Sequence, residues 1–265
     1  MQIISNLKTK IMIPKKIHFC WYGRGEYNDV ITKCIQSWSD RLPDYEIKKW
    51  DETNTPFEKL PFLRLLYKQK KWSFISDYMR LYSIYTEGGI YLDTDIEIIK
   101  DFAELLIEDS FVGFQTNLKN KYPLNSAVIG AVKESSFILD CIKATERKQR
   151  LHFNAMGGPP IVTNVLYDYG LKIYEKQHLN KVLLLPTEYF YPFAWFEKFT
   201  LDCITENTIC IHWWEDSWVN KKKDTAYFID SIKRKMEKVP MIFSNRIKFA
   251  LNKEKFYYIN KMRID

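Results

Sequence analysis

Residues 88–99 decide the fold, and they are Gly88-Gly89-Ile90-Tyr91-Leu92-Asp93-Thr94-Asp95-Ile96-Glu97-Ile98-Ile99. The apolar run 90–92 predicts a buried strand, and the alternation over 96–99 predicts a second apolar segment. Asp93 and Asp95 stand between them, although aspartate is a poor strand former. A hard cation would explain both, because Mg²⁺ and Mn²⁺ take oxygen ligands and are commonly held by one or two carboxylates with substrate phosphates. A polar turn in a hairpin is the alternative that the motif alone leaves open.

Strands alternate with helices along the chain, which predicts an α/β fold. A strand over residues 15–23, a helix over 29–38 with Asp29 as N-cap, and a strand over 45–50 predict a βαβ unit. Further helices are expected over residues 60–70, 72–87, 102–107, 136–150 and 161–169. Further strands are expected over residues 111–115, 126–132, 182–185 and 209–211, and an aromatic loop over 189–195.

The helix over residues 72–87 is apolar around most of its surface, which predicts a largely buried helix. Ser73 is its expected N-cap, and Gly88 is expected to end it. Asp77 and Arg80 lie on one face of this helix because they are three residues apart. Charges on a buried helix must be paired or functional, and a private salt bridge and a binding role both remain open.

The composition limits the class of protein. Aromatic residues make up 16% of the chain, which suits either stacking on flat or sugar-like ligands or an aromatic core. Five cysteines, an odd number without a CxxC pair, predict reduced thiols in a cytoplasmic protein. Neither a signal peptide nor an apolar run of about 18 residues is visible, so no membrane span is predicted.

The net charge of +7 is concentrated at the C-terminal end. Residues 219–265 hold 13 Lys and Arg against 5 Asp and Glu, whereas residues 1–218 hold 27 against 28. We therefore expect a catalytic domain over 1–218 and a basic amphipathic helical extension over 219–265. Basic residues that alternate with apolar ones predict docking on an anionic membrane surface, at the inner face of the cell membrane. A solvated helix packed on the body is the alternative, and nucleic acid is not an expected partner.

Three blocks of sequence resemble glycosyltransferase family 32, the DXD-motif sugar transferases, and the catalytic domain of the large clostridial glucosylating toxins. The blocks are Ile13-Pro14-Lys15-Lys16-Ile17-His18 with Trp21, then Trp38, Tyr45 and Trp50-Asp51, then Ser76-Asp77-Tyr78-Met79-Arg80 with residues 88–95. The resemblance is close over 13–50 and 73–99 and patchy from there to Trp218. It implies a GT-A fold with a mixed central sheet, a manganese or magnesium ion, a nucleotide-sugar donor and retention of anomeric configuration.

The resemblance also implies roles for individual residues. The residues implied in catalysis are Asp77, Arg80, Asp93, Asp95 and Asn125. Those implied in binding the nucleotide sugar are Trp21, which would stack on the base, with Gly89, Tyr91, Asp93, Ser217 and Trp218. Those implied in binding metal are Asp93, Asp95 and His212, with Glu215 or Asp216 as alternatives to His212.

The expected function is metal-dependent, retaining transfer of a hexose from a nucleotide sugar to a glycan or lipid-linked saccharide in capsular or other surface polysaccharide synthesis. UDP-hexose is the favoured donor because of Trp21, and GDP-mannose remains open. A protein acceptor and a non-catalytic sugar-nucleotide-binding protein are alternatives. A haloacid-dehalogenase-type phosphatase is disfavoured, because its motif needs Thr or Val where Glu97 stands.

Overall fold

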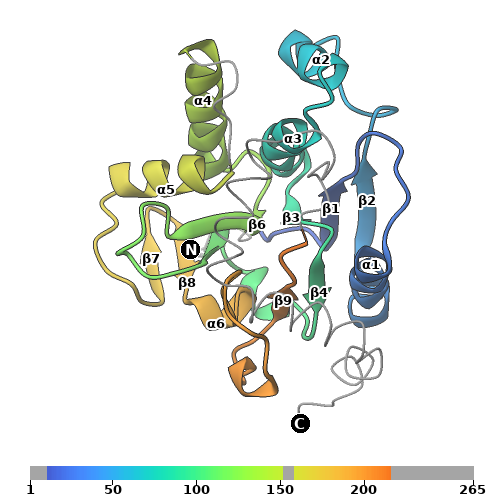
Figure 1. Cartoon of the computed structure of the whole chain (residues 1–265). Coiled ribbons are helices and arrows are strands. Elements are labelled where there is room, and N and C mark those ends of the chain that lie inside the picture. Colours follow the sequence, from blue (N-terminus) through green and yellow to red (C-terminus); the bar gives the residue numbers. More distant parts are fainter. Residues whose placement is uncertain (1–10, 152–157, 216–265) are drawn as a thin grey trace, which may run out of the picture.

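The computed structural model describes residues 11–151 and 158–215 of the 265-residue chain (Figure 1). The predicted extension over 219–265 and the predicted site residues Asp216, Ser217 and Trp218 lie outside the described residues. Among the described helices, none is both long and apolar enough to cross a membrane. All five cysteines are unpaired, and four of them are buried.

A seven-stranded sheet forms the centre of the molecule, in the order β2-β1-β3-β6-β5-β8-β7. Its strands are β1 (Lys16–Cys20), β2 (Glu46–Trp50), β3 (Gly89–Leu92), β5 (Ser110–Phe114), β6 (Leu124–Ala131), β7 (Gln177–Leu179) and β8 (Val182–Leu185). β1 runs parallel to β2 and β3, whereas β6 runs antiparallel to β3 and β5. The sheet is therefore mixed, which confirms the predicted α/β class with a mixed central sheet.

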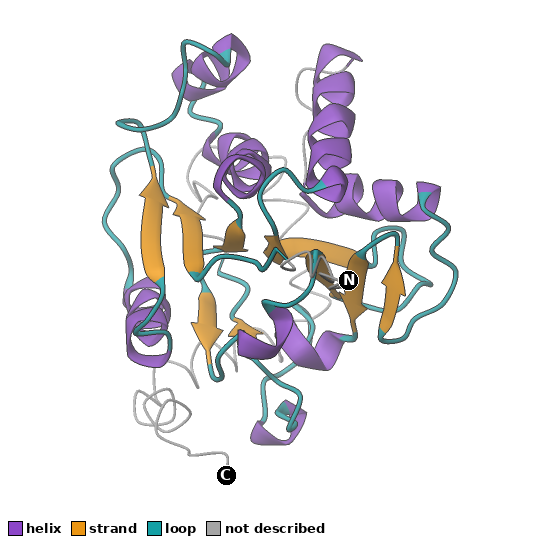
Figure 2. Ribbon diagram, turned by 180° about the vertical axis from the view of Figure 1, so that it is seen from behind, coloured by secondary structure: helices purple, strands orange, loops and turns teal. Residues whose placement is uncertain are grey.

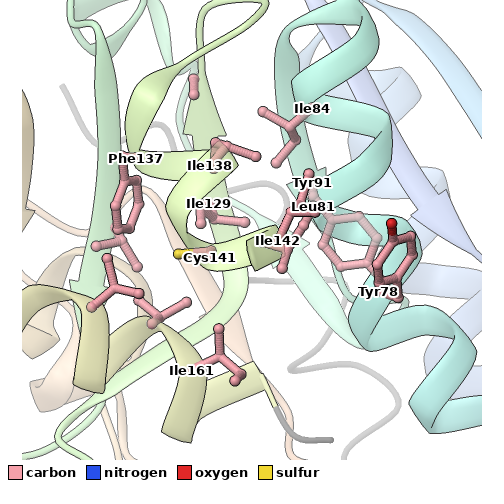
Figure 3. Packing of buried hydrophobic residues seen from close by; sticks show 14 of the residues in the cluster. Tyr78, Leu81, Ile84, Tyr91, Ile129, Phe137, Ile138, Cys141, Ile142 and Ile161 are labelled. Carbon is pink, nitrogen blue, oxygen red and sulfur yellow. The ribbon is translucent and has the colours of Figure 1, made fainter. Parts of the chain in front are cut away.

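Helices cover both faces of this sheet (Figure 2). They are α1 (Asp29–Arg41), α2 (Pro61–Lys68), α3 (Trp72–Glu87), α4 (Ser136–Leu151), α5 (Gly158–Asp168) and the short α6 (Thr187–Phe190). Side chains of α3, α4 and α5 pack with Tyr91 and Ile129 into one core cluster, part of which Figure 3 shows. Trp38 of α1 and Phe190 of α6 pack with Ile90 into a second cluster. Because Ile90 and Tyr91 are neighbours on one strand, the two clusters lie on opposite faces of the sheet.

Several predicted boundaries need correction. The N-cap of α1 is Asn28, whose side chain accepts a hydrogen bond from the Ile31 amide, so the prediction of Asp29 was wrong by one residue. α3 has no side-chain cap and begins before Ser73, so that prediction was also wrong. The helix expected over 102–107 is a single 3₁₀ turn, Ala103–Leu105, and α5 begins three residues earlier than expected.

The two strands that flank the Asp-Thr-Asp turn belong to different sheets. β3 lies in the large sheet, but β4 (Ile96–Ile98) pairs antiparallel with β9 (Cys210–His212) in a separate two-stranded ribbon. The turn therefore does not close a hairpin, and that alternative is wrong. Upstream, Gly88 ends α3 with φ +70°, and a Cβ there would lie 2.8 Å from the Lys133 amide nitrogen, so glycine is required.

Candidate functional site

Arg80 is the centre of a charged cluster at the end of β3. Its guanidinium lies 3.0 Å from the Asp77 carboxylate and 3.3 Å from the Asp93 carboxylate. It also donates to the Ser126 carbonyl at 2.9 Å and packs on the ring of Tyr91, 4.8 Å from its centroid. The Tyr91 hydroxyl donates to Asp93 at 3.1 Å. The predicted residues Asp77, Arg80, Tyr91 and Asp93 are therefore brought together.

Burial and charge control the ionisation of this cluster. Burial raises the pKa of Asp77, and the neighbouring Arg80 only partly opposes that rise. Burial disfavours the charged form of Arg80, but Asp93, Tyr91 and Asp77 outweigh it and raise the pKa of Arg80. Arg80 is therefore a permanent buried cation beside Asp93. Such a cation can stabilise negative charge on a bound phosphate or departing group.

The first residue of α5 lies against this cluster. The Gly158 amide donates a hydrogen bond to Asp77. A Cβ on Gly158 would lie 2.2 Å from Ser126 Oγ and 3.2 Å from Asp77 Oδ1, so no side chain fits there. The sequence assigned no role to Ser126, and for Gly158 it left open a plain turn or a close approach of the backbone to a ligand. The signals were present but weak, because Gly158 lies in a Gly-Gly-Pro-Pro segment and Ser126 directly follows Asn125.

Asp95 has a different set of partners, which come from the end of the described chain. Its Oδ2 accepts from the Glu215 amide at 2.8 Å and lies 3.2 Å from His212 Nε2. Its backbone carbonyl accepts from the Trp213 amide at 3.0 Å. Burial alone would raise the pKa of Asp95, but the His212 ring and the Glu215 amide together lower it. Asp95 is therefore held as a carboxylate.

Asp95 and His212 fit a divalent cation as two of its ligands. Their facing O and N atoms are 3.2 Å apart, a spacing that adjacent ligands of one ion adopt at ordinary metal–ligand distances. Within residues 11–151 and 158–215, no three His, Cys, Asp or Glu side chains gather into a complete site. Substrate oxygens could supply other ligands, as they commonly do for Mg²⁺. The Glu215 side chain instead accepts from Asn28, at 3.4 Å.

The remaining predicted residues lie at different distances from the cluster. Asn125 precedes Ser126 on β6, and its amide is fixed by hydrogen bonds with Gln115 and the Ala127 amide, both 2.9 Å long. Trp21 follows β1, and extending the pairing of His18 with Tyr91 places it level with the turn after β3. Its half-buried ring packs edge-on against Tyr27, with the ring centroids 4.7 Å apart.

Gly89 is not brought to the cluster. It begins β3, four residues before Asp93, and a Cβ there would lie 2.6 Å from the Lys16 carbonyl of β1. Its φ of +113° also favours glycine. Close backbone packing therefore accounts for Gly89.

Comparison with known proteins agrees with this geometry. Residues 28–112, which include Asp77, Arg80 and both aspartates of the turn, match the family model described as "Glycosyltransferase sugar-binding region containing DXD motif". Residues 28–112 form a glycosyltransferase sugar-binding region. The resemblance stated from the sequence is confirmed at this level. The DXD glycosyltransferase family implies a nucleotide-sugar donor and typically a divalent metal ion.

Similar proteins include lactosylceramide 4-alpha-galactosyltransferases. The Rattus norvegicus protein is 28% identical over 209 residues, which cover 70% of this chain and 53% of the relative. The Mus musculus protein is 28% identical over 164 residues, which cover 58% and 42%. The chain therefore spans about half the length of these curated relatives.

Similar solved structures are also glycosyltransferases. The PaToxG glycosyltransferase has a TM-score of 0.49 at 20% identity, over 60% of this chain and 70% of that chain. An active-site mutant of LgtC has a TM-score of 0.47 at 13% identity, over 83% and 95%.

Proposed function

We propose that the chain is a metal-dependent, retaining hexosyltransferase that uses a UDP-sugar donor. One observation carries the proposal: the Asp93-Thr94-Asp95 turn joins Asp95 and His212, the pair that would bind a metal ion, to the buried guanidinium of Arg80. A nucleoside diphosphate leaving group needs positive charge on both sides of its phosphates. The turn places the two sources next to each other.

The chain's own residues divide the chemistry between them. A divalent cation, when bound at Asp95 and His212, would neutralise charge on the diphosphate as the glycosidic bond breaks. Arg80 lies on the other side of the turn and would stabilise the same developing charge, an effect worth several kcal/mol, roughly, in preorganised sites. Asp77 and Asp93 orient Arg80 and supply acceptors for sugar or ribose hydroxyls. Asn125 lies next to Ser126 and would contact the donor sugar.

Two further features of the site support retention and the choice of donor. No side chain of the described cluster is placed as a separate general base, which suits a mechanism in which the departing phosphate accepts the acceptor's proton. The half-buried ring of Trp21, beside the turn, suits stacking on uracil, although the geometry also allows the guanine of GDP-mannose.

The acceptor is proposed to be a glycan or a lipid-linked saccharide. The curated relatives are named as acting on lactosylceramide, which is a glycolipid. We further propose a cytoplasmic location on the inner face of the cell membrane, reached through the basic residues 219–265, whose sequence carries 13 Lys and Arg. Salt-sensitive binding of the full chain to anionic vesicles, absent for neutral vesicles, would support that location.

Hydrolysis of nucleotide sugars by the purified chain tests the proposed function. UDP-glucose, UDP-galactose and GDP-mannose would each be incubated with and without manganese, and release of the nucleoside diphosphate would be measured. We expect metal-dependent release from a UDP-hexose, and α-configured free sugar as the first product by NMR. Release from GDP-mannose alone would change the donor, and no binding or release of any of the three would overturn the function.

A further inference from the structure

Glu97 is a buried acidic residue that the chemistry described above does not use. It lies in the middle of β4, two residues after Asp95, and its exposed fraction is 0%. One carboxyl oxygen accepts from Trp213 Nε1 at 2.8 Å, and the other has no hydrogen-bond partner among the described residues. A buried polar atom without a partner costs about 1–3 kcal/mol. Stability alone would be served as well or better by an apolar residue at this position.

Trp213 connects Glu97 to Asp95 and His212, the two residues that would bind the metal ion. Its side chain binds Glu97, while its backbone amide binds the Asp95 carbonyl at 3.0 Å. Two residues later, the Glu215 amide reaches Asp95 Oδ2 at 2.8 Å. One residue earlier, His212 faces the same oxygen. The segment 212–215 therefore wraps around Asp95. The Glu97–Trp213 bond is a side-chain attachment of this segment to β4, in addition to the backbone pairing of Ile96 with His212.

The backbone of this segment is bent to make the contact. Trp214 has φ +57°, which is unusual for a bulky residue and costs of the order of 1 kcal/mol or more. Its indole donates to the Phe193 carbonyl at 3.0 Å, and the centroids of its ring and the His212 ring are 4.0 Å apart. Such a conformation persists only where neighbouring contacts hold it. Two partly buried indole hydrogen bonds, those of Trp213 and Trp214, provide these contacts.

We infer that Glu97 and Trp213 are positioning residues, which hold segment 212–215 so that His212 and the Glu215 amide orient the Asp95 carboxylate for a divalent cation. This inference deepens the proposed function and rests on it for the metal. Neither residue contacts substrate. The competing explanation is an ordinary core hydrogen bond that affects stability alone.

Three substitutions and one control separate the two explanations. Glu97→Gln keeps an acceptor for the indole, Glu97→Leu removes it, and Trp213→Phe removes the donor but keeps an aromatic ring. The matched control is Trp38→Phe. The fully buried Trp38 donates its indole hydrogen to the Ile96 carbonyl of the same strand at 2.7 Å, so its replacement removes an indole hydrogen bond to β4 other than the one that Trp213 makes.

The first measurement is hydrogen exchange at the Glu215 amide in the full chain without ligand, alongside thermal unfolding. We expect Glu97→Leu and Trp213→Phe to speed exchange at this amide by about tenfold or more. Glu97→Gln should stay within about threefold of the parent. Trp38→Phe should lower the unfolding temperature without changing this amide. Equal protection of Glu215 in all variants would overturn the inference.

The second measurement is the affinity for manganese in the presence of UDP and, in a parallel series, GDP, by calorimetry. We expect about tenfold weaker manganese binding in Glu97→Leu and Trp213→Phe, with rescue in Glu97→Gln. Unchanged manganese affinity despite faster exchange would also overturn the inference. If the parent binds neither metal nor nucleotide, the proposed function fails, while exchange at Glu215 still decides whether Glu97 and Trp213 hold the segment. If Glu97→Leu does not fold, the exchange rate at Glu215 and the manganese affinity of Trp213→Phe, compared with the parent, decide the inference.

Discussion

The two aspartates of the Asp93-Thr94-Asp95 turn lie one residue apart but in contrasting surroundings. Asp93 belongs to what we call the α3 side, with Asp77 and Arg80, where a permanent cation neutralises the carboxylates through side-chain contacts. Asp95 belongs to the ribbon side, with His212 and Glu215, where a backbone amide and an imidazole contact one oxygen. The α3 side has its own cation, the Arg80 guanidinium, whereas Asp95 on the ribbon side could take a divalent metal ion as its counter-charge.

This contrast indicates different roles for the carboxylates of Asp93 and Asp95. Asp93 is already paired with Arg80, so a cation placed there would be repelled by the guanidinium. Asp95 has no Lys or Arg partner among the described contacts, and burial makes its charge costly without a cation. The metal should therefore depend mainly on Asp95, although the sequence predicted Asp93 as a ligand as well. Four substitutions test the division, from the largest expected effect to the smallest.

Asp95→Asn should have the largest effect, on activity. It keeps an oxygen that can accept from the Glu215 amide but removes the charge that a divalent cation needs. We expect metal-dependent hydrolysis of the donor to fall by about a thousandfold, equivalent to roughly 4 kcal/mol of barrier. Asp101→Asn, whose carboxylate accepts from Tyr45 away from the turn, is the control. Donor hydrolysis assays over a manganese series would show the loss, and near-parent activity at every concentration would remove Asp95 from the metal site.

The two sides also differ in how far sequence analysis could foresee them. Asp77 and Arg80 are three residues apart on one helix, and Asp93 ends a short apolar strand, so local periodicity placed each of them on its element. The resemblance then joined the three residues in one site. The ribbon side depends on β4 pairing with β9, more than a hundred residues later. Three-residue strands carry almost no periodic signal, and no local pattern specifies which distant strand they pair with.

Resemblance filled part of that gap, because it pointed to His212 before any pairing was known. It did not reveal Glu97, Trp213 or Gly158, because their importance arises from packing rather than from residue type. A Cβ clash at Gly158 and a buried bond between Glu97 and Trp213 become visible only when distant segments are placed together. The N-cap corrections are smaller. At α1 the cap is Asn28 and not its polar neighbour Asp29, whereas α3 begins at Trp72 without a side-chain cap.

Arg80→Met should have the largest effect on stability, because it leaves the carboxylates of Asp77 and Asp93 without their cation. We expect a loss of about 3 kcal/mol in the free energy of unfolding at pH 7. Burial already raises the pKa of Asp77, and without Arg80 that pKa would rise further in the folded state. Protonation of Asp77 would then favour folding, so part of the loss should be recovered as pH falls toward 5. Urea unfolding at several pH values measures this.

The matched control for Arg80→Met is Arg64→Met on α2. Arg64 is half exposed and paired with Glu58, so its loss should cost under about 1 kcal/mol. A similar small cost for Arg80→Met, without recovery at low pH, would show that the α3 side does not need its cation.

Gly158→Ala should disturb the α3 side while leaving the ribbon side intact. The new methyl group would lie 2.2 Å from Ser126 Oγ, so either α5 or the Ser126 hydroxyl, which accepts from Arg80, must shift. We expect a loss of about 1–3 kcal/mol in stability and weaker donor binding, with the manganese affinity unchanged. Ser126→Ala removes the clashing oxygen, so the double variant should be more stable than the sum of the single changes predicts. Strict additivity in urea unfolding would contradict the contact.

Trp21→Ala should have the smallest effect, and it should fall on nucleotide affinity alone. Trp21 lies beyond both sides of the turn, after β1, with its indole donating to the Gly25 carbonyl and its ring against Tyr27. Base–aromatic stacking is worth about 1–3 kcal/mol, so UDP binding should weaken by roughly ten- to a hundredfold. Because Trp21 contacts neither Asp95 nor Arg80, the manganese concentration that gives half-maximal donor hydrolysis should not change. Trp195→Ala, at an exposed aromatic residue outside the cluster, is the control for general loss of an indole. Calorimetric titration of both variants with UDP at saturating manganese gives the comparison, and equal UDP affinity in Trp21→Ala and the parent would return Trp21 to a purely structural role in its loop.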